Sequence, residues 1–166
     1  MLLYIHIPFC DSKCHYCAFN STTNLHHLKN EYIKSLCKQL KYELSNIKKD
    51  ELKTVFIGGG TPSTLDIDNF SKIFEIINPY ITNTKEITIE ANPNSATLKW
   101  LEDMYSLGIN RISFGVQSFD DKKLDFLGRN HTSKMAITAI QNASNVGFRH
   151  INCDIIYDTA LDTKEL

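Results

Sequence analysis

The sequence lacks both a long hydrophobic run and a strong excess of one charge. No segment approaches the ~18 consecutive apolar residues typical of a membrane-spanning helix, so we expect no transmembrane segment. The 18 basic and 19 acidic residues leave a formal net charge of −1, which gives no electrostatic reason to expect nucleic acid or an acidic membrane as a partner. The apolar start, residues 1–8, has no basic leader and is interrupted by Pro8, so we expect no signal peptide and a cytoplasmic location.

Linkers, internal repeats and low-complexity tracts are also missing. No stretch rich in proline, glycine and serine separates one part of the sequence from another. A chain of this length buries roughly 70% of its unfolded surface on folding, which is enough for one core. We therefore expect residues 1–166 to form one continuous unit.

The five cysteines are an odd number, and three of them lie within eight residues, at Cys10, Cys14 and Cys17. A disulfide framework normally uses an even number that joins distant segments. Clustered cysteines without a secretory signal favour a bound metal in a reducing compartment. Cys37 and Cys153 lie in helix-like and strand-like apolar patterns, so we expect them to be structural thiols.

Three thiolates on one loop could hold three corners of a cubane iron–sulfur cluster, which usually takes four cysteine ligands. One iron would then keep an open coordination position. A structural zinc site usually pairs its ligands as Cys-x-x-Cys and recruits a second pair, which is missing here. His6 or His15 could still supply a fourth ligand, so a zinc-binding structural domain remains an alternative.

The remaining sequence alternates between strand and helix periodicity. Apolar spacing predicts helices over 25–47, 70–77, 98–105 and 137–146, with Asn24 and Thr132 as N-caps and Gly108 and Gly147 as C-terminal stops. The predicted strands are 2–7, 54–57, 86–90, 111–116 and 151–157. Strands separated by helices through short connections predict an α/β fold with a parallel sheet.

Alternation within the predicted strands separates two faces of the sheet. A doubly wound sheet would be apolar on both faces, whereas one polar face suits a barrel or partial barrel that encloses a polar ligand. Active sites of such barrels lie at the carboxyl ends of the strands, where the cysteine loop follows strand one. The apolar face carries Leu3, Ile5, Ile7, Val55, Ile57, Ile87, Ile89, Ile112, Phe114, Val116, Ile151, Cys153 and Ile155. The polar face carries Tyr4, His6, Gly58, Thr88, Glu90, Ser113, Gly115, Gln117, Asn152 and Asp154.

The pattern Cys-x-x-x-Cys-x-aromatic-Cys after a first strand resembles the radical S-adenosylmethionine (SAM) superfamily. Six further short motifs resemble the oxygen-independent coproporphyrinogen III oxidase family and occur in the order found in that family. Together they run from Tyr4 to Tyr157. They are LYIHIPFC (3–10), GGGTP (58–62), EANP (90–93), GVQSF (115–119), LGRNH (127–131) and DIIY (154–157).

This resemblance implies a partial (β/α)6 barrel, similar to a TIM barrel, in which five βα units are present and the chain stops before closure. Residues 1–166 would then be an incomplete radical SAM core without the C-terminal domain of the family. The resemblance further implies a [4Fe-4S] cluster on Cys10, Cys14 and Cys17 whose open iron chelates SAM. A reduced cluster would cleave SAM to a 5′-deoxyadenosyl radical, which a barrel interior shields.

The resemblance also assigns cofactor contacts position by position. Tyr4 would flank the cofactor, and Gly59, Gly60 and Thr61 would receive the methionyl end of SAM. The rest of SAM would be bound by Glu90, Gln117, Arg129 and Asp154. From the residues alone, a glycine triplet after a strand is usually a turn, and a lone acid usually lies in a surface ion pair. An acid inside a strand, such as Asp154, is costly unless it is paired. We expect Tyr16 to pack against the cluster or adenine, His6 to be a candidate substrate contact, and His15, His26 and His27 to be solvated.

The family divides into an oxidase, which decarboxylates coproporphyrinogen III, and a heme chaperone branch (HemW-like) without that activity. Oxidases resemble one another in a further cysteine two positions after the third ligand, where this sequence has Phe19, and in a segment before the first strand. Both departures indicate the chaperone branch, with heme bound outside this chain, an electron donor, and acceptor hemoproteins as partners. The family motif Gly-Leu-Pro-Gly after Tyr157 is replaced by residues 158–161, so this sequence departs from the family in a loop that helps to shape the SAM pocket. The oxidase, acting on a porphyrinogen, remains the alternative.

Overall fold

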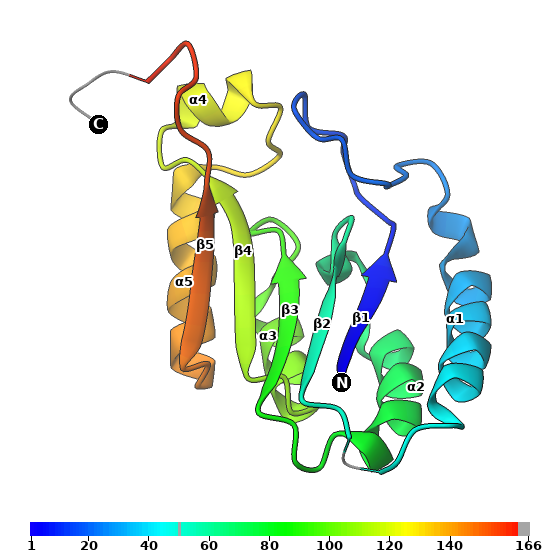
Figure 1. Ribbon diagram of the computed structural model, residues 1–166. Coiled ribbons are helices and arrows are strands. Elements are labelled where there is room, and N and C mark those ends of the chain that lie inside the picture. Colours follow the sequence, from blue (N-terminus) through cyan, green and yellow to red (C-terminus); the bar gives the residue numbers. More distant parts are fainter. Residues whose placement is uncertain (50, 163–166) are drawn as a thin grey trace.

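The computed structural model describes residues 1–49 and 51–162, and it contains a five-stranded parallel sheet in the order β1-β2-β3-β4-β5 (Figure 1). The strands are β1 (Leu2–Ile7), β2 (Thr54–Gly59), β3 (Glu86–Ala91), β4 (Arg111–Gln117) and β5 (His150–Ile155). The α-helices are α1 (Lys29–Leu44), α2 (Ile67–Ile77), α3 (Leu98–Ser106), α4 (Asp121–Phe126) and α5 (Ser133–Val146). Three 3-10 turns, η1 (His26–Leu28), η2 (Pro62–Thr64) and η3 (Asn78–Tyr80), complete the elements. The predicted α/β class with a parallel sheet is confirmed.

Helices α1, α2, α3 and α5 cover one face of the sheet, while α4 lies beyond the carboxyl ends of the strands (Figure 1). The predicted apolar face points into this core, where Ile7, Ile57, Ile89 and Phe114 are fully buried. Ile155 is the exception, because it is 50% exposed. The pairing of β4 with β5 shifts between Phe114 and Gln117, so that Ile155 pairs with Gln117 at the end of the edge strand β5.

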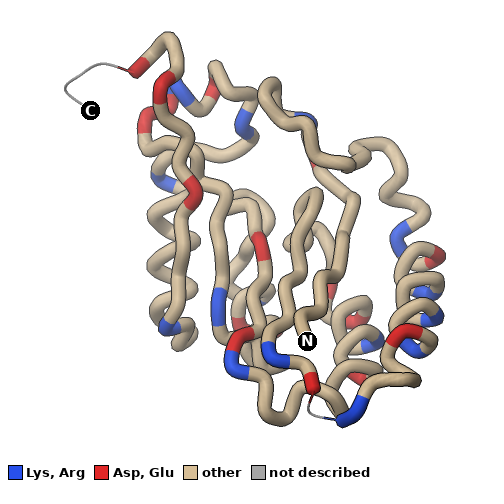
Figure 2. The backbone as a smooth tube through the Cα atoms, in the orientation of Figure 1, with Lys and Arg blue, Asp and Glu red and all other residues tan. Residues whose placement is uncertain are grey.

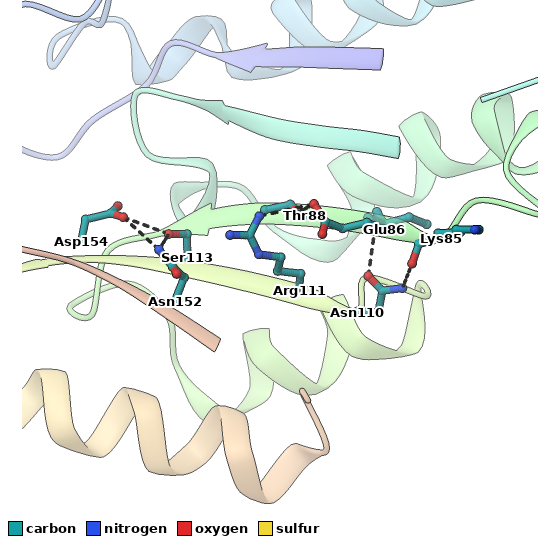
Figure 3. Close-up of polar contacts among 9 residues, drawn as sticks. Lys85, Glu86, Thr88, Asn110, Arg111, Ser113, Asn152 and Asp154 are labelled. Atoms are coloured by element: carbon teal, nitrogen blue, oxygen red, sulfur yellow. Dashed lines mark hydrogen bonds and ion pairs between the residues drawn. The ribbon is translucent and has the colours of Figure 1, made fainter. Parts of the chain in front are cut away.

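The opposite face is polar, as the alternation predicts, and its side chains bond to one another across the strands (Figure 3). At the start of β4, Arg111 Nη1 lies 3.3 Å from Glu86 Oε1, which also accepts from Thr88 Oγ1 at 3.1 Å. At the other end, Asp154 Oδ1 accepts from Ser113 Oγ and Asn152 Nδ2, each at 3.3 Å. The polar side chains of this face, called the inner face below, are therefore hydrogen-bonded to one another without a ligand.

Charges of both signs are interspersed along α1 and the loops (Figure 2). Within the described residues, no helix combines the length and the apolarity needed to cross a membrane.

The helix termini follow the sequence signals with one exception. Thr132 caps α5 and Gly147 ends it with φ +117°, and Gly108 follows α3 with φ +92°. The predicted cap at Asn24 is wrong, because the turn η1 separates Asn24 from α1. The Asn24 side chain instead accepts a hydrogen bond from Thr22 Oγ1 at 2.8 Å.

We expect Thr132→Ala to destabilise the protein by about 1 kcal/mol, because the N–H of Met135 then loses its cap. Urea unfolding of the wild-type and variant proteins measures the difference. Thr138→Ala is the matched control, because Thr138 is exposed within α5 and its hydroxyl bonds only to Lys134 O of the same helix. Equal losses from the two substitutions would contradict the capping role.

Candidate functional site

A pocket lies at the carboxyl ends of the strands, under the loop that follows β1. The loop is fixed at its base by backbone bonds, Thr22 N to Pro8 O at 2.7 Å and Cys10 N to Thr22 O at 2.9 Å. Every predicted site residue except Tyr4 lines this pocket. They are Cys10, Cys14, Cys17, Gly59, Gly60, Thr61, Glu90, Gln117, Arg129 and Asp154.

The far side of the cysteine loop contacts the segment after α4. His15 donates from its backbone N to Leu127 O at 3.1 Å and from Nδ1 to Phe126 O at 2.9 Å. His26 is also engaged, with Nε2 donating to Cys10 O at 3.0 Å. His15 and His27 are exposed as expected, although His15 is also hydrogen-bonded, whereas His26 is half-buried, so the expectation that it is solvated is wrong. His15 and His26 hold the backbone of the loop in place.

All five cysteines are free thiols, and two of the three loop cysteines accept hydrogen bonds. Thr61 Oγ1 donates to Cys10 Sγ at 3.3 Å, and Arg129 Nη1 donates to Cys14 Sγ at 3.1 Å. Across residues 1–49 and 51–162, no three His, Cys, Asp or Glu side chains gather closely enough to hold a single metal ion. The ligands of a cluster bind different irons and need not converge on one point. Cysteine sulfurs that accept hydrogen bonds from Thr61 and Arg129 therefore suit a cluster, which carries negative charge on its sulfurs.

The glycines at the end of β2 are required by close contacts within the fold itself. A Cβ on Gly59, which has φ +113°, would lie 2.5 Å from the His6 ring. A Cβ on Gly60 would lie 2.8 Å from the carbonyl carbon of Pro8 and 2.9 Å from the oxygens of Ile7 and Phe9. Bare backbone is therefore required because the end of β2 passes directly against β1 and the start of the cysteine loop.

Two carboxylates face the pocket from neighbouring parts of the sheet. Glu90 Oε2 accepts from Gly59 N at 3.0 Å. Burial raises the pKa of Glu90, the Gly59 bond opposes this, and the nearby Asp154 carboxylate raises the pKa further. Asp154 is exposed as well as hydrogen-bonded to Ser113 and Asn152, so its place in a strand carries little desolvation penalty (Figure 3). The pair makes this side of the pocket electronegative.

Gln117 occupies the irregularity at the end of β4. Its φ of +69° is left-handed, which is uncommon for a residue with a side chain, and its carbonyl accepts from Ile156 N at 3.0 Å. Such strain costs on the order of 1 kcal/mol and tends to occur at functional sites. Here it accompanies a side chain that lines the pocket.

Tyr4 lies on the inner face, outside the pocket lining. Its hydroxyl donates to His6 Nδ1 at 3.0 Å, and its ring stacks on Phe56 with centroids 6.1 Å apart. His6 Nε2 donates in turn to Asn20 O at 2.9 Å. The contact between Tyr4 and SAM therefore stays a prediction, and the structure gives this residue a second task, which is to orient His6.

Several residues of the site were not predicted from the sequence. Asn92 lines the pocket and donates from Nδ2 to Asn130 Oδ1 at 2.9 Å. Lys13 holds the loop closed by donating to Phe19 O at 2.9 Å and to Ser21 Oγ at 3.1 Å. The only sequence signal for Asn92 was its place in the family motif EANP (90–93).

His131 is a buried residue beneath the pocket that sequence analysis also missed. Its Nε2 donates to Val116 O at 3.1 Å, while its Nδ1 is buried without a partner in the described part of the chain. Burial, and then the positive charge of Arg129, lower the pKa of His131 to about 4. The ring is therefore neutral at pH 7 and supports the backbone just before Gln117.

The depressed pKa of His131 predicts a pH-dependent stability. The unfolded chain takes up a proton near the ordinary pKa of 6.5, before the folded chain does, so the free energy of unfolding falls as the pH drops from 6.5 to about 4. We expect a loss of about 2 kcal/mol over this window, measured by urea unfolding. His131→Gln should flatten the profile in this window, whereas His27→Gln, at an exposed position, should not. Parallel profiles for wild type and His131→Gln would refute the assignment.

Comparisons with known proteins agree with this geometry. The sequence model of the radical SAM superfamily matches residues 4–159 of this chain. The chain is 36% identical over 157 residues to heme chaperone HemW of Bacillus subtilis (strain 168), with 93% of this chain and 41% of the relative covered. It is 40% identical over 162 residues to heme chaperone HemW of Escherichia coli (strain K12), with 93% and 42% covered.

Among solved structures, coproporphyrinogen III oxidase (HemN) from Escherichia coli superimposes with a TM-score of 0.87 at 27% identity, over 99% of this chain and 39% of that one. The chain thus spans about two fifths of the length of these relatives. The family model covers the sheet, the cysteine loop and the pocket together, and the chain therefore belongs to the radical SAM superfamily.

Proposed function

We propose that residues 1–166 form the radical SAM core of a heme chaperone similar to HemW. In this proposal the chain binds a [4Fe-4S] cluster and SAM, and the whole protein binds heme and transfers it to acceptor hemoproteins. The observation that carries it is the 30–42% identity to HemW proteins over 82–98% of this chain, against 27% to the oxidase structure. Phe19, at the position of the additional oxidase cysteine, supports the same branch.

Cys10, Cys14 and Cys17 would hold three corners of the cluster. When bound, the cluster supplies the electron that cleaves the sulfonium of SAM. Thr61 and Arg129 contribute hydrogen bonds to the sulfurs of Cys10 and Cys14. Lys13 keeps the ends of the cysteine loop together, and the burial of Cys10 keeps water from that sulfur.

SAM would occupy the pocket between the cysteine loop and the ends of β2 to β5. The carboxylates of Glu90 and Asp154 suit its positively charged and hydroxyl-bearing groups, because both line the pocket and have oxygens able to accept further bonds. Gln117 and the backbone of Gly59, Gly60 and Thr61 offer neutral polar groups on the remaining wall. Tyr4 lies outside the lining, so its position flanking the cofactor is proposed from the family resemblance alone.

The oxidase is the second candidate, since the structural similarity to HemN extends over 99% of this chain. The zinc-binding domain is disfavoured by membership of the radical SAM superfamily. An electron donor for the cluster is a further partner that we propose on chemical grounds. The free, clustered thiols lead us to propose a cytoplasmic location.

A product assay with the full-length protein separates the two functions. The reconstituted protein is incubated anaerobically with SAM, a reductant and coproporphyrinogen III, and the porphyrins are separated by chromatography. A heme titration is followed by absorption in parallel. We expect stable heme binding without formation of protoporphyrinogen. Turnover of coproporphyrinogen would establish the oxidase and overturn the chaperone.

A further inference from the structure

Arg129 connects the end of β4 with the cysteine loop. Its Nη2 donates to Gly115 O at 2.6 Å, and its Nη1 donates to Cys14 Sγ at 3.1 Å and to Tyr16 Oη at 3.4 Å. Its Nε is buried and has no partner within the described residues. The guanidinium therefore bridges one fixed acceptor in the sheet and one cysteine sulfur that lies 115 residues away in the sequence.

This arrangement differs from the role that the family resemblance implies for Arg129. An arginine that binds a carboxylate usually presents two parallel N–H groups to it. Here both terminal nitrogens bond to protein acceptors, and the third nitrogen is buried. The guanidinium is thus oriented toward the cysteine loop.

We propose that Arg129 is a positioning residue for Cys14, which fixes its sulfur and raises the reduction potential of the cluster. The proposal rests on the cluster binding proposed above. A charged donor stabilises negative charge on sulfur, and the reduced cluster carries one more negative charge than the oxidised one. Among the three loop thiols as described, Cys10 accepts only from the neutral hydroxyl of Thr61, so the charged donor acts on Cys14 alone.

Arg129→Gln removes the charge and the bridge, and Arg149→Gln is the matched control. Arg149 is exposed and directly precedes β5, at the opposite end of the sheet from the pocket. The full-length proteins are reconstituted with iron and sulfide and titrated anaerobically without SAM, with EPR detection of the reduced cluster. Omitting SAM separates an effect on the cluster from an effect on SAM binding. The rate of iron loss to a chelator is measured in the same samples.

We expect Arg129→Gln to shift the equilibrium toward the oxidised cluster about tenfold, which corresponds to 59 mV for one electron, and to release iron faster. Arg149→Gln should match wild type in both measurements. Arg129→Lys keeps the charge but cannot bridge both acceptors, so its shift should be smaller and in the same direction. If Arg129→Gln folds but holds no cluster, Arg129→Lys is tested against the same two outcomes.

Unchanged potential and iron release in the Arg129 variants would overturn this inference and leave cluster binding intact. A wild-type protein that takes up no acid-labile sulfide would instead overturn the proposed function itself.

Discussion

Cys14→Ser is expected to abolish cluster binding. Serine is a poor iron ligand at neutral pH, and the substitution also removes the sulfur that accepts the hydrogen bond from Arg129. Iron and acid-labile sulfide should fall from about four of each per chain to below about one. Both are measured colorimetrically after anaerobic reconstitution and desalting.

Cys37→Ser provides the control for this result. Cys37 lies on α1, is partly buried against the core, and its sulfur lies 3.7 Å from Lys72 O, far from the pocket lining. Its replacement also removes one thiol, so it tests nonspecific binding of iron to cysteine. Iron and sulfide at wild-type levels in Cys14→Ser would contradict the binding of the cluster by Cys10, Cys14 and Cys17 jointly.

Gly60→Ala is expected to destabilise the protein by about 3 kcal/mol through overpacking. The added Cβ would lie within 2.9 Å of the backbone of residues 7–9, and backbone atoms cannot rotate away as a side chain can. Gly60 N also donates to Ile7 O at 2.8 Å, and Thr61 N donates to Phe9 O at 2.8 Å. Displacement of Gly60 would therefore move the start of the cysteine loop. Urea unfolding measures the loss of stability.

Gly108→Ala separates crowding from backbone strain. Gly108 has φ +92°, but a Cβ added there would meet no atom within 4 Å, so alanine should cost only about 1 kcal/mol. If Gly60→Ala costs no more than Gly108→Ala, the close approach of β2 to the loop does not explain the glycine.

The sheet and the position of the site were predictable because both depend on local patterns. Alternation of apolar and polar residues marks β3, β4 and β5 throughout and β1 in part, whereas β2 has the apolar run Val55–Ile57. Parallel strands bring their carboxyl ends to one edge. The cysteines and Glu90 therefore reach one pocket in the structure. Asp154 follows the same logic, since it lies near the end of the fifth strand.

The contacts within the site could not be predicted from the sequence. The bond from Arg129 to Cys14 joins segments 115 residues apart and depends on how α4 and the following loop pack above the sheet. The short helix α4 has only six residues and too little periodicity to reveal it. The burial of His131 follows from the same packing. Tyr4 lies in the middle of β1 and outside the pocket lining, and its hydroxyl bonds to His6.

The most direct test of the account is the metal content of the wild-type protein after anaerobic reconstitution, with the EPR spectrum of its reduced form. We expect about four irons and four acid-labile sulfides per chain, and an EPR signal that changes when SAM is added. About one zinc per chain with no acid-labile sulfide would contradict the cluster, and with it the proposed function.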